Sequence, residues 1–129
     1  TAWLFGPGGE NFVTKIRLAL TTGSAVPVTE DQVGSPTFTN DLARAIRALV
    51  ADGAPFGIYH LVNSGAASRA DVAEEIRRVT GLPGSIARVR TTDLPGRAPR
   101  PLHSVLRNTK RPLLRPWPDA LQEYLRNES

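Results

Sequence analysis

Apolar residues recur every three or four positions in two early segments of the chain, the spacing of a helix with one buried face. The first predicted helix spans residues 11–21 and stops before Gly23. The second begins at a capping Asn40, carries Asp41 at its positive end and stops at Gly53. Its expected buried stripe consists of Leu42, Ala45, Ile46, Leu49 and Val50.

Two further helices are predicted in the second half of the chain. Ser68 is a predicted N-cap, and Asp71 stands three residues later, where a capping box places its acid. Gly81 and Pro83 end this helix. A last helix is expected after Pro118, and its apolar stripe consists of Leu121, Tyr124 and Leu125.

Short apolar or alternating runs between the helices predict strands. These runs cover residues 2–5, 26–29 and 57–62, with a weaker one at 86–90. Residues 34–37 and 92–102 are expected to be loops because they contain prolines. Strands that alternate with helices indicate the α/β class, here with short strands and about four helices that lean on a larger sheet.

Length and composition restrict the classes of protein and of site. The 129 residues suit one domain over 1–129. No cysteine is present, so disulfides and thiolate metal sites are excluded, and with two histidines we expect no metal ligands. No apolar run approaches the ~20 residues that cross a bilayer, so we expect no membrane partner and a cytoplasmic location.

Positive charge is concentrated in one stretch of a chain whose net charge is +4. Such a stretch attracts phosphate, either of a nucleotide or of nucleic acid, or else forms a solvated basic surface. Of the aromatic residues that stack on bases, only Trp117 is close, so we expect no nucleic-acid partner. Only Asp93 opposes the basic residues, which are Arg88, Arg90, Arg97, Arg100, Arg107, Lys110, Arg111 and Arg115.

A glycine-rich turn follows the first predicted strand and precedes the first predicted helix. Gly6, Gly8 and Gly9 have this context in common with a dinucleotide fingerprint, but Asn11 occupies the position of the third glycine. No acidic residue follows at the expected distance on a second strand. A complete dinucleotide site is therefore not predicted, although the N–H groups that begin the helix can hold a phosphate.

The chain contains no complete catalytic set. Hydride transfer of the short-chain dehydrogenase type needs a tyrosine acid beside a lysine that lowers its pKa. Here Tyr59 is followed four residues later by Asn63, and Tyr124 by Glu128, so no Tyr-x-x-x-Lys pair exists. The surroundings of His60 and His103 do not resemble a nucleophile elbow. We therefore predict no catalytic residue in this chain.

Several motifs, in a fixed order, resemble the C-terminal half of the dTDP-4-dehydrorhamnose reductases, a family of extended short-chain dehydrogenases. Two long segments carry most of the resemblance, Thr1-Ala-Trp-Leu-Phe-Gly-Pro-Gly-Gly-Glu-Asn-Phe-Val13 and Asp31-Gln-Val-Gly-Ser-Pro-Thr-Phe-Thr-Asn-Asp-Leu-Ala43. Gly57-Ile-Tyr-His-Leu61 matches a family strand. A later motif is filled by Arg100, Pro101, Ser104, Leu106 and Asn108.

The resemblance implies the C-terminal substrate-binding part of an extended short-chain dehydrogenase (Rossmann-type) fold, without its N-terminal dinucleotide-binding half. The parent enzyme would reduce dTDP-4-keto-6-deoxy-L-mannose to dTDP-L-rhamnose with NADPH or NADH. This chain alone is expected to be inactive and to hold no cofactor. Its expected partners are a dTDP-sugar, its own N-terminal half and, through an exposed strand at residues 2–5, a second copy. The alternative is a regulatory module like the regulatory subunit of methionine adenosyltransferase.

The resemblance also assigns four substrate-binding residues. Trp3 would face the sugar and the nicotinamide edge, or else pack in the core. Asn11 would bond to the diphosphate or cap its helix, and Gln32 would shape the loop around the nucleotide. Arg100 would pair with the diphosphate or form a surface salt bridge.

Overall fold

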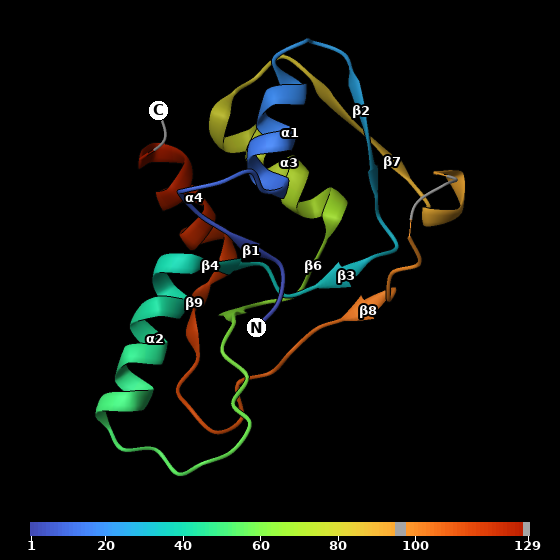
Figure 1. Cartoon of the computed structure of the whole chain (residues 1–129). Coiled ribbons are helices and arrows are strands. Elements are labelled where there is room, and N and C mark those ends of the chain that lie inside the picture. The colour runs from blue at the N-terminus through green and yellow to red at the C-terminus, as the bar shows by residue number, and fades with distance from the viewer. Residues whose placement is uncertain (95–97, 128–129) are drawn as a thin grey trace.

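The computed structural model describes residues 1–94 and 98–127 as an α/β arrangement of short strands and four α-helices (Figure 1). The predicted fold class is therefore confirmed. A short 3-10 turn, η1 (Thr91–Asp93), follows the strands that border the site described below. Within the loop predicted at 92–102, residues 95–97 lie outside the described residues, and with them the basic residue Arg97.

The two longest strands come from distant parts of the sequence. β2 (Ala25–Thr29) and β7 (Ser85–Val89) pair in parallel, in a register that runs from Ala25 opposite Ser85 to Thr29 opposite Val89. Helices α1 (Phe12–Leu20) and α3 (Arg69–Thr80) pack together and against this pair of strands (Figure 1). Parallel strands need a long crossover, which the intervening elements provide.

Both of these helices begin at the predicted caps. The Asn11 side chain accepts hydrogen bonds from N–H groups in the first turn of α1. Ser68 Oγ accepts from the backbone N of Asp71, and the Asp71 carboxylate accepts from the backbone N of Ser68, both at 3.0 Å. Gly81 ends α3 with φ of 65°, in the left-handed region that favours glycine. Local sequence signals thus fix both helix starts.

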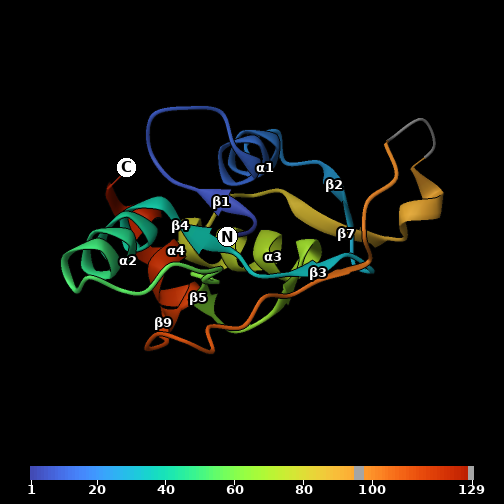
Figure 2. The same ribbon diagram turned by 60° about the horizontal axis from the view of Figure 1, so that its bottom comes forward.

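Three small sheets arrange the remaining segments (Figure 2). They pair β1 (Leu4–Phe5) with β4 (Thr37–Phe38), place β3 (Val33–Gly34) between β6 (Ala67–Ser68) and β8 (His103–Ser104), and pair β5 (Asn63–Ser64) with β9 (Leu114–Pro116). The loop predicted at residues 34–37 therefore contains ends of two strands, which was not predicted. These strands form because their partners arrive from distant segments, which local spacing does not reveal.

An aromatic cluster joins β1, β4 and α4 (Trp117–Asn127). The ring centroids of Phe5, Phe38 and Tyr124 lie 5.6 to 5.9 Å apart. Leu121 and Leu125 of α4 are buried in the same core. Burial of each such side chain contributes about 1.5–3 kcal/mol, so this cluster anchors the first strand, which leads into the site.

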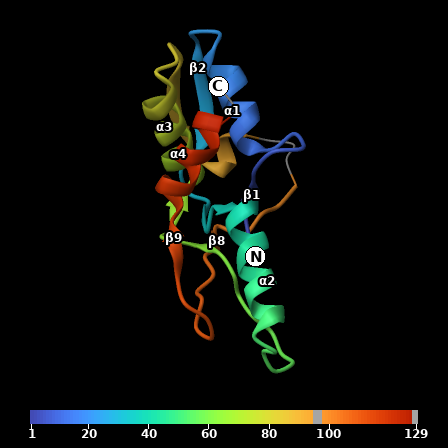
Figure 3. The ribbon, with the colours of Figure 1, turned by 90° about the vertical axis from the view of Figure 1, so that its left-hand side faces the viewer.

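The second helix departs from the prediction at its start and on its apolar face. α2 spans Thr39–Ala51, and its N-cap is Phe38, so the predicted cap at Asn40 was wrong. Ile46 and Val50 are 46% and 74% exposed, so the predicted stripe is not buried in this structure. Figure 3 shows α2 at the opposite end of the molecule from α1 and β2. Helical spacing marks an apolar face, but burial also needs a neighbouring surface.

Asp41 fastens the first turn of α2 to the rest of the fold. It is 7% exposed and accepts hydrogen bonds from Arg115 Nε at 2.7 Å and Asn63 Nδ2 at 2.8 Å. Burial raises the pKa of this carboxyl, but the hydrogen bonds, first of all from Arg115, outweigh burial and hold the pKa below its ordinary value. This network links α2 to β5, β9 and, through Glu123, to α4.

The strand predicted at residues 57–62 does not form among the described residues, and that prediction was wrong. Strand pairing here is confined to β5, and Ile58 is 79% exposed. A strand needs a hydrogen-bonding neighbour along its length. The Asn108 side chain takes this role for one residue, accepting from the N of Val62 at 3.1 Å and donating to its carbonyl at 3.3 Å.

Candidate functional site

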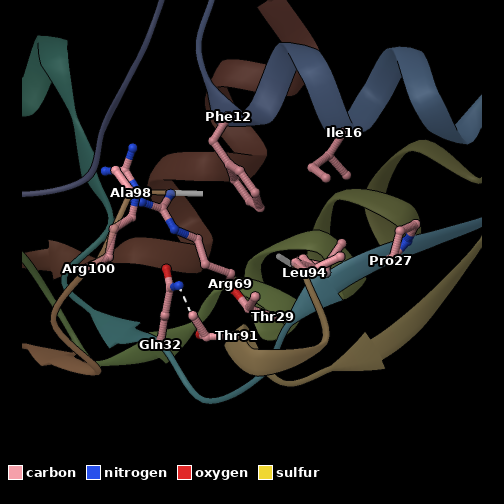
Figure 4. Close-up of a pocket in the computed structure, with 11 residues that line it drawn as sticks. Phe12, Ile16, Pro27, Thr29, Gln32, Arg69, Thr91, Leu94, Ala98 and Arg100 are labelled. Carbon is pink, nitrogen blue, oxygen red and sulfur yellow. Dashed lines mark hydrogen bonds between the residues drawn. The ribbon is translucent and has the colours of Figure 1, made fainter. Parts of the chain in front are cut away.

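A cleft opens where α1, the start of α3 and the segment before β8 meet (Figure 4). It consists of two adjoining cavities of about 250 and 470 Å³. Both cavities are lined by Phe12, Gln32, Arg69 and Arg100, so they share one wall. The larger cavity is lined by all four residues predicted to bind substrate, namely Trp3, Asn11, Gln32 and Arg100.

The smaller cavity is an apolar slot. Phe12 and Ile16 of α1 face Pro27 of β2 and Leu94 across it (Figure 4). Hydroxyl groups of Thr29 and Thr91 also border this cavity. A slot with apolar walls and a few polar groups suits a flat heterocycle, which needs its faces covered and its edge hydrogen-bonded.

Hydrogen bonds between two loops form the floor of the cleft. Gln32 is 8% exposed, and its Nε2 donates to Thr91 Oγ1 at 3.0 Å. The Asp31 carboxylate accepts from the backbone N of Thr91 at 3.0 Å and from its hydroxyl at 2.7 Å. These two bonds, the backbone one first, lower the pKa of Asp31. Gln32 therefore joins the two loops of the floor, while its role in shaping the loop around a nucleotide stays a prediction.

Trp3 forms the far wall of the larger cavity and is half-buried. Its φ of 46° lies in the left-handed region, which is uncommon for a residue with a side chain. The indole lies directly against Gly34, where an added Cβ would be 2.3 Å from Trp3 Cε2. The surrounding structure therefore holds Trp3 in an unusual backbone conformation with its indole in the wall of the larger cavity, outside the core cluster.

Arg69, the first residue of α3, belongs to the cleft but was not predicted. Its guanidinium carbon lies 3.8 Å from the Trp3 ring centroid and 4.8 Å from that of Phe12. In the sequence it is an ordinary residue at a helix start, between the cap and the acid of a capping box. Since its partners lie far away in the sequence, no local signal could have identified it.

Arg100 extends from the segment that leads into β8. That segment is held by the hydrogen bond from the N of Val33 to the carbonyl of Leu102, at 2.7 Å. Within residues 1–94 and 98–127, Arg100 forms no ion pair with a carboxylate. The described structure thus does not use Arg100 in the salt bridge considered as its alternative role, and its contact with a diphosphate stays a prediction.

Asn11 uses its side chain in the helix cap. Its Oδ1 accepts from the N–H groups of Val13 and Thr14, at 2.9 and 3.2 Å. Its Nδ2 donates to the carbonyl of Gly6 at 3.0 Å and lies 3.4 Å from the hydroxyl of Tyr124. The capping role is confirmed, and a direct contact of Asn11 with substrate stays a prediction.

Neither tyrosine of the chain lines the cleft. Tyr124 is 3% exposed in the core, and the Tyr59 hydroxyl donates to the carbonyl of Pro55 at 2.7 Å beside Lys110. Across the described residues, no group of histidine, aspartate and glutamate side chains could hold a metal ion. In the same part of the chain, no helix has the length and apolar character needed to cross a membrane.

Most of the basic stretch is neutralised or turned away from the cleft. Arg88 pairs with Asp71 at 2.9 Å, and Arg111 pairs with Asp52. Arg115 belongs to the network around Asp41. Arg100 is the member of the stretch that lines the cleft among the described residues, and attraction of phosphate by this residue stays a prediction.

Comparison with known proteins agrees with this geometry. A family model, the RmlD substrate binding domain, matches residues 1–129. The spore coat polysaccharide biosynthesis protein SpsK of Bacillus subtilis is 41% identical, over 100% of this chain and 46% of that protein. A dTDP-4-dehydrorhamnose reductase of Clostridium acetobutylicum superposes with a TM-score of 0.92 at 36% identity, over 98% of this chain and 46% of the other. The corresponding reductase of Bacillus anthracis, in complex with NADP, gives 0.89 at 26% identity, with the same coverage.

Proposed function

Because the chain belongs to the RmlD substrate binding domain family, we propose that it forms the sugar-nucleotide-binding wall of an NAD(P)H-dependent reductase. The chain spans less than half the length of the relatives it matches, so the activity of a whole enzyme is part of the proposal. The reaction would be reduction of the 4-keto group of dTDP-4-keto-6-deoxy-L-mannose to give dTDP-L-rhamnose. The regulatory alternative is not favoured, because the solved relatives are named as reductases.

The single observation that carries this proposal is the convergence of Trp3, Asn11, Gln32 and Arg100 on one cleft. These residues come from three separate parts of the sequence, and a chance arrangement would scatter them. The apolar slot would hold the base between Phe12 and Pro27. The Trp3 indole, in the wall of the larger cavity, would contact the apolar part of the deoxysugar.

In this proposal the chain binds and orients the substrate, whereas the proton and hydride come from elsewhere. The nicotinamide would supply the hydride, and NADP bound to the Bacillus anthracis reductase supports that choice of cofactor. A tyrosine with a lowered pKa, in an N-terminal dinucleotide-binding half, would donate the proton. This chain by itself would therefore show no turnover.

The N-terminal half would dock on the apolar surface that the described chain leaves open. The large apolar side chains exposed in the described chain include Leu4, Ile46, Val50 and Ile58, which are 46%, 46%, 74% and 79% exposed. Such exposed apolar side chains would be covered if the N-terminal half packed against them. The part of each relative that this chain does not match is long enough to form such a partner.

Calorimetric titration of the chain with dTDP tests the proposal, with UDP and CDP as competitors of equal charge. We expect dTDP to bind, and we expect its affinity to fall about tenfold or more when Phe12 is replaced by alanine, since base stacking contributes about 1–3 kcal/mol. Equal affinity for all three nucleotides, or no binding, would contradict the proposed substrate class. A hydride-transfer assay on the chain alone should show no turnover.

A further inference from the structure

The side chain of Arg69 has a fixed path and no assigned role. Its backbone N donates to the carbonyl of Gln32 at 3.2 Å, which fixes the start of α3 against the floor of the cleft. Its guanidinium carbon lies over the rings of Trp3 and Phe12, 3.8 and 4.8 Å from their centroids. A planar guanidinium stacked on aromatic faces keeps its N–H donors free at the edge. Arg69 thus presents donors to the cleft from a preorganised position.

A second guanidinium group reaches the same space. Figure 4 shows the side chains of Arg69 and Arg100 converging on one side of the cleft. Burial, and in second place the nearby charge of Arg100, lowers the pKa of Arg69 to about 10, so Arg69 stays cationic at neutral pH. Like charges so close repel each other, and a bound dianion removes that repulsion.

The described chain does not provide the counter-ion for this pair. Neither arginine forms an ion pair with a carboxylate within residues 1–94 and 98–127. Glu10 also lines the larger cavity, but its carboxylate is 78% exposed and is paired with Lys15 at 2.9 Å. The charge of the cleft wall is therefore positive.

On the basis of the proposed function, we infer that Arg69 and Arg100 form a paired guanidinium seat for the diphosphate of the ligand, and that the Arg69–Trp3 stack couples occupancy of this seat to the indole. The position supports this assignment, because both arginines line both cavities. The seat thus lies between the apolar slot and Trp3, where a diphosphate joins a nucleoside to a sugar. Bidentate donors from two guanidinium forks match the oxygens of this group.

Inorganic pyrophosphate is a suitable probe, because it lacks the base and the sugar. Calorimetry would measure its affinity, and Trp3 fluorescence would report on the stack. We expect R69Q and R100Q each to weaken pyrophosphate and dTDP about ten- to a hundredfold, as loss of charge-assisted hydrogen bonds implies. R69K should retain part of the affinity but lose the planar stack. R47Q, which removes an exposed arginine of α2 outside the cleft, is the matched control and should bind as the wild type does.

The fluorescence response separates binding from coupling. Trp117 is 9% exposed in the core, so the ligand-dependent change in emission should come from Trp3. We expect W3F to bind pyrophosphate but to lose this change, and R69K to reduce it. An identical response in R69K and wild type would overturn the coupling. Thermal melts of all variants would identify any loss of folding, and R69K and R100Q keep the test valid if R69Q unfolds.

The outcomes distinguish this inference from the proposed function. If dTDP binds and R69Q leaves its affinity and that of pyrophosphate within about twofold of wild type, the seat is wrong and the nucleotide site stands. If pyrophosphate binds through Arg69 but dTDP is not preferred over UDP and CDP, the seat stands and the thymidine-specific function fails. If wild-type chain binds neither pyrophosphate nor dTDP, both are wrong.

Discussion

Replacing Gly34 by alanine should displace Trp3 while leaving the fold intact. A Cβ at this position would lie 2.3 Å from Cε2 and 2.6 Å from both Cζ2 and Nε1 of the indole. Carbon atoms in contact prefer about 3.5–4.0 Å, so the ring must retreat by more than about 1 Å. The φ of Gly34 is not in the left-handed region, so the effect of the substitution is steric.

The expected cost in stability depends on how the indole responds. Overpacking a closely packed site costs about 1–3 kcal/mol. Moving the indole also weakens its contact with the Arg69 guanidinium, and cation–π contacts of this kind contribute about 0.5–2 kcal/mol. We therefore expect a fall of about 1–3 kcal/mol in the free energy of unfolding if the ring stays near its place, and a fall of about 0.5–2 kcal/mol if it swings out into the cleft and loses the Arg69 contact.

Urea unfolding, followed by circular dichroism, measures the stability term, and quenching of tryptophan fluorescence by acrylamide measures the exposure of Trp3. Gly9→Ala is the matched control, because its Cβ would meet no atom within 4 Å. We expect G34A to show a changed Trp3 emission and weaker dTDP binding, and G9A to resemble wild type. Wild-type stability and quenching in G34A would refute the close Trp3–Gly34 contact on which this reasoning depends.

Further predictions concern the elements that hold the cleft. Asp41→Asn should lower the free energy of unfolding by about 2–3 kcal/mol in urea titrations, because Arg115 loses its buried partner but keeps Glu123; an unchanged midpoint would contradict the network. Since the pKa of Asp41 is lowered in the folded state, the unfolded chain takes up its proton at a higher pH, and stability should fall as the pH drops below about 4, less steeply in D41N. Asn11→Ala should cost about 1–2 kcal/mol in a thermal melt through loss of the cap, whereas Asn11→Ser should restore most of it. Thr91→Val should weaken dTDP binding in calorimetry more than it lowers the melting temperature, because the hydroxyl joins the two loops of the cleft floor; equal affinity would count against that role.

Most of the features that depend on residues close together in the sequence were predicted correctly, whereas several features that depend on distant residues were not. The caps at Asn11 and Ser68 were predictable because a cap involves residues two or three positions apart. The α2 stripe was identified as apolar but wrongly expected to be buried, since spacing reveals a face and not its neighbour. The short strands β3 and β4 were missed because their partners lie in distant segments.

The sequence by itself determined the α/β class, the starts of α1 and α3, the family, and which four residues were expected at one binding site. These depend on the local spacing of residues, or on motifs that follow one another in a fixed order along the chain. Only the tertiary structure decided that the four residues share a cleft and that Arg69 joins them. It also decided that Trp3 adopts its left-handed backbone conformation against Gly34. The physical reason is that stacking, steric contact and unpaired charge arise between groups far apart in sequence, and folding alone brings them within a few ångströms.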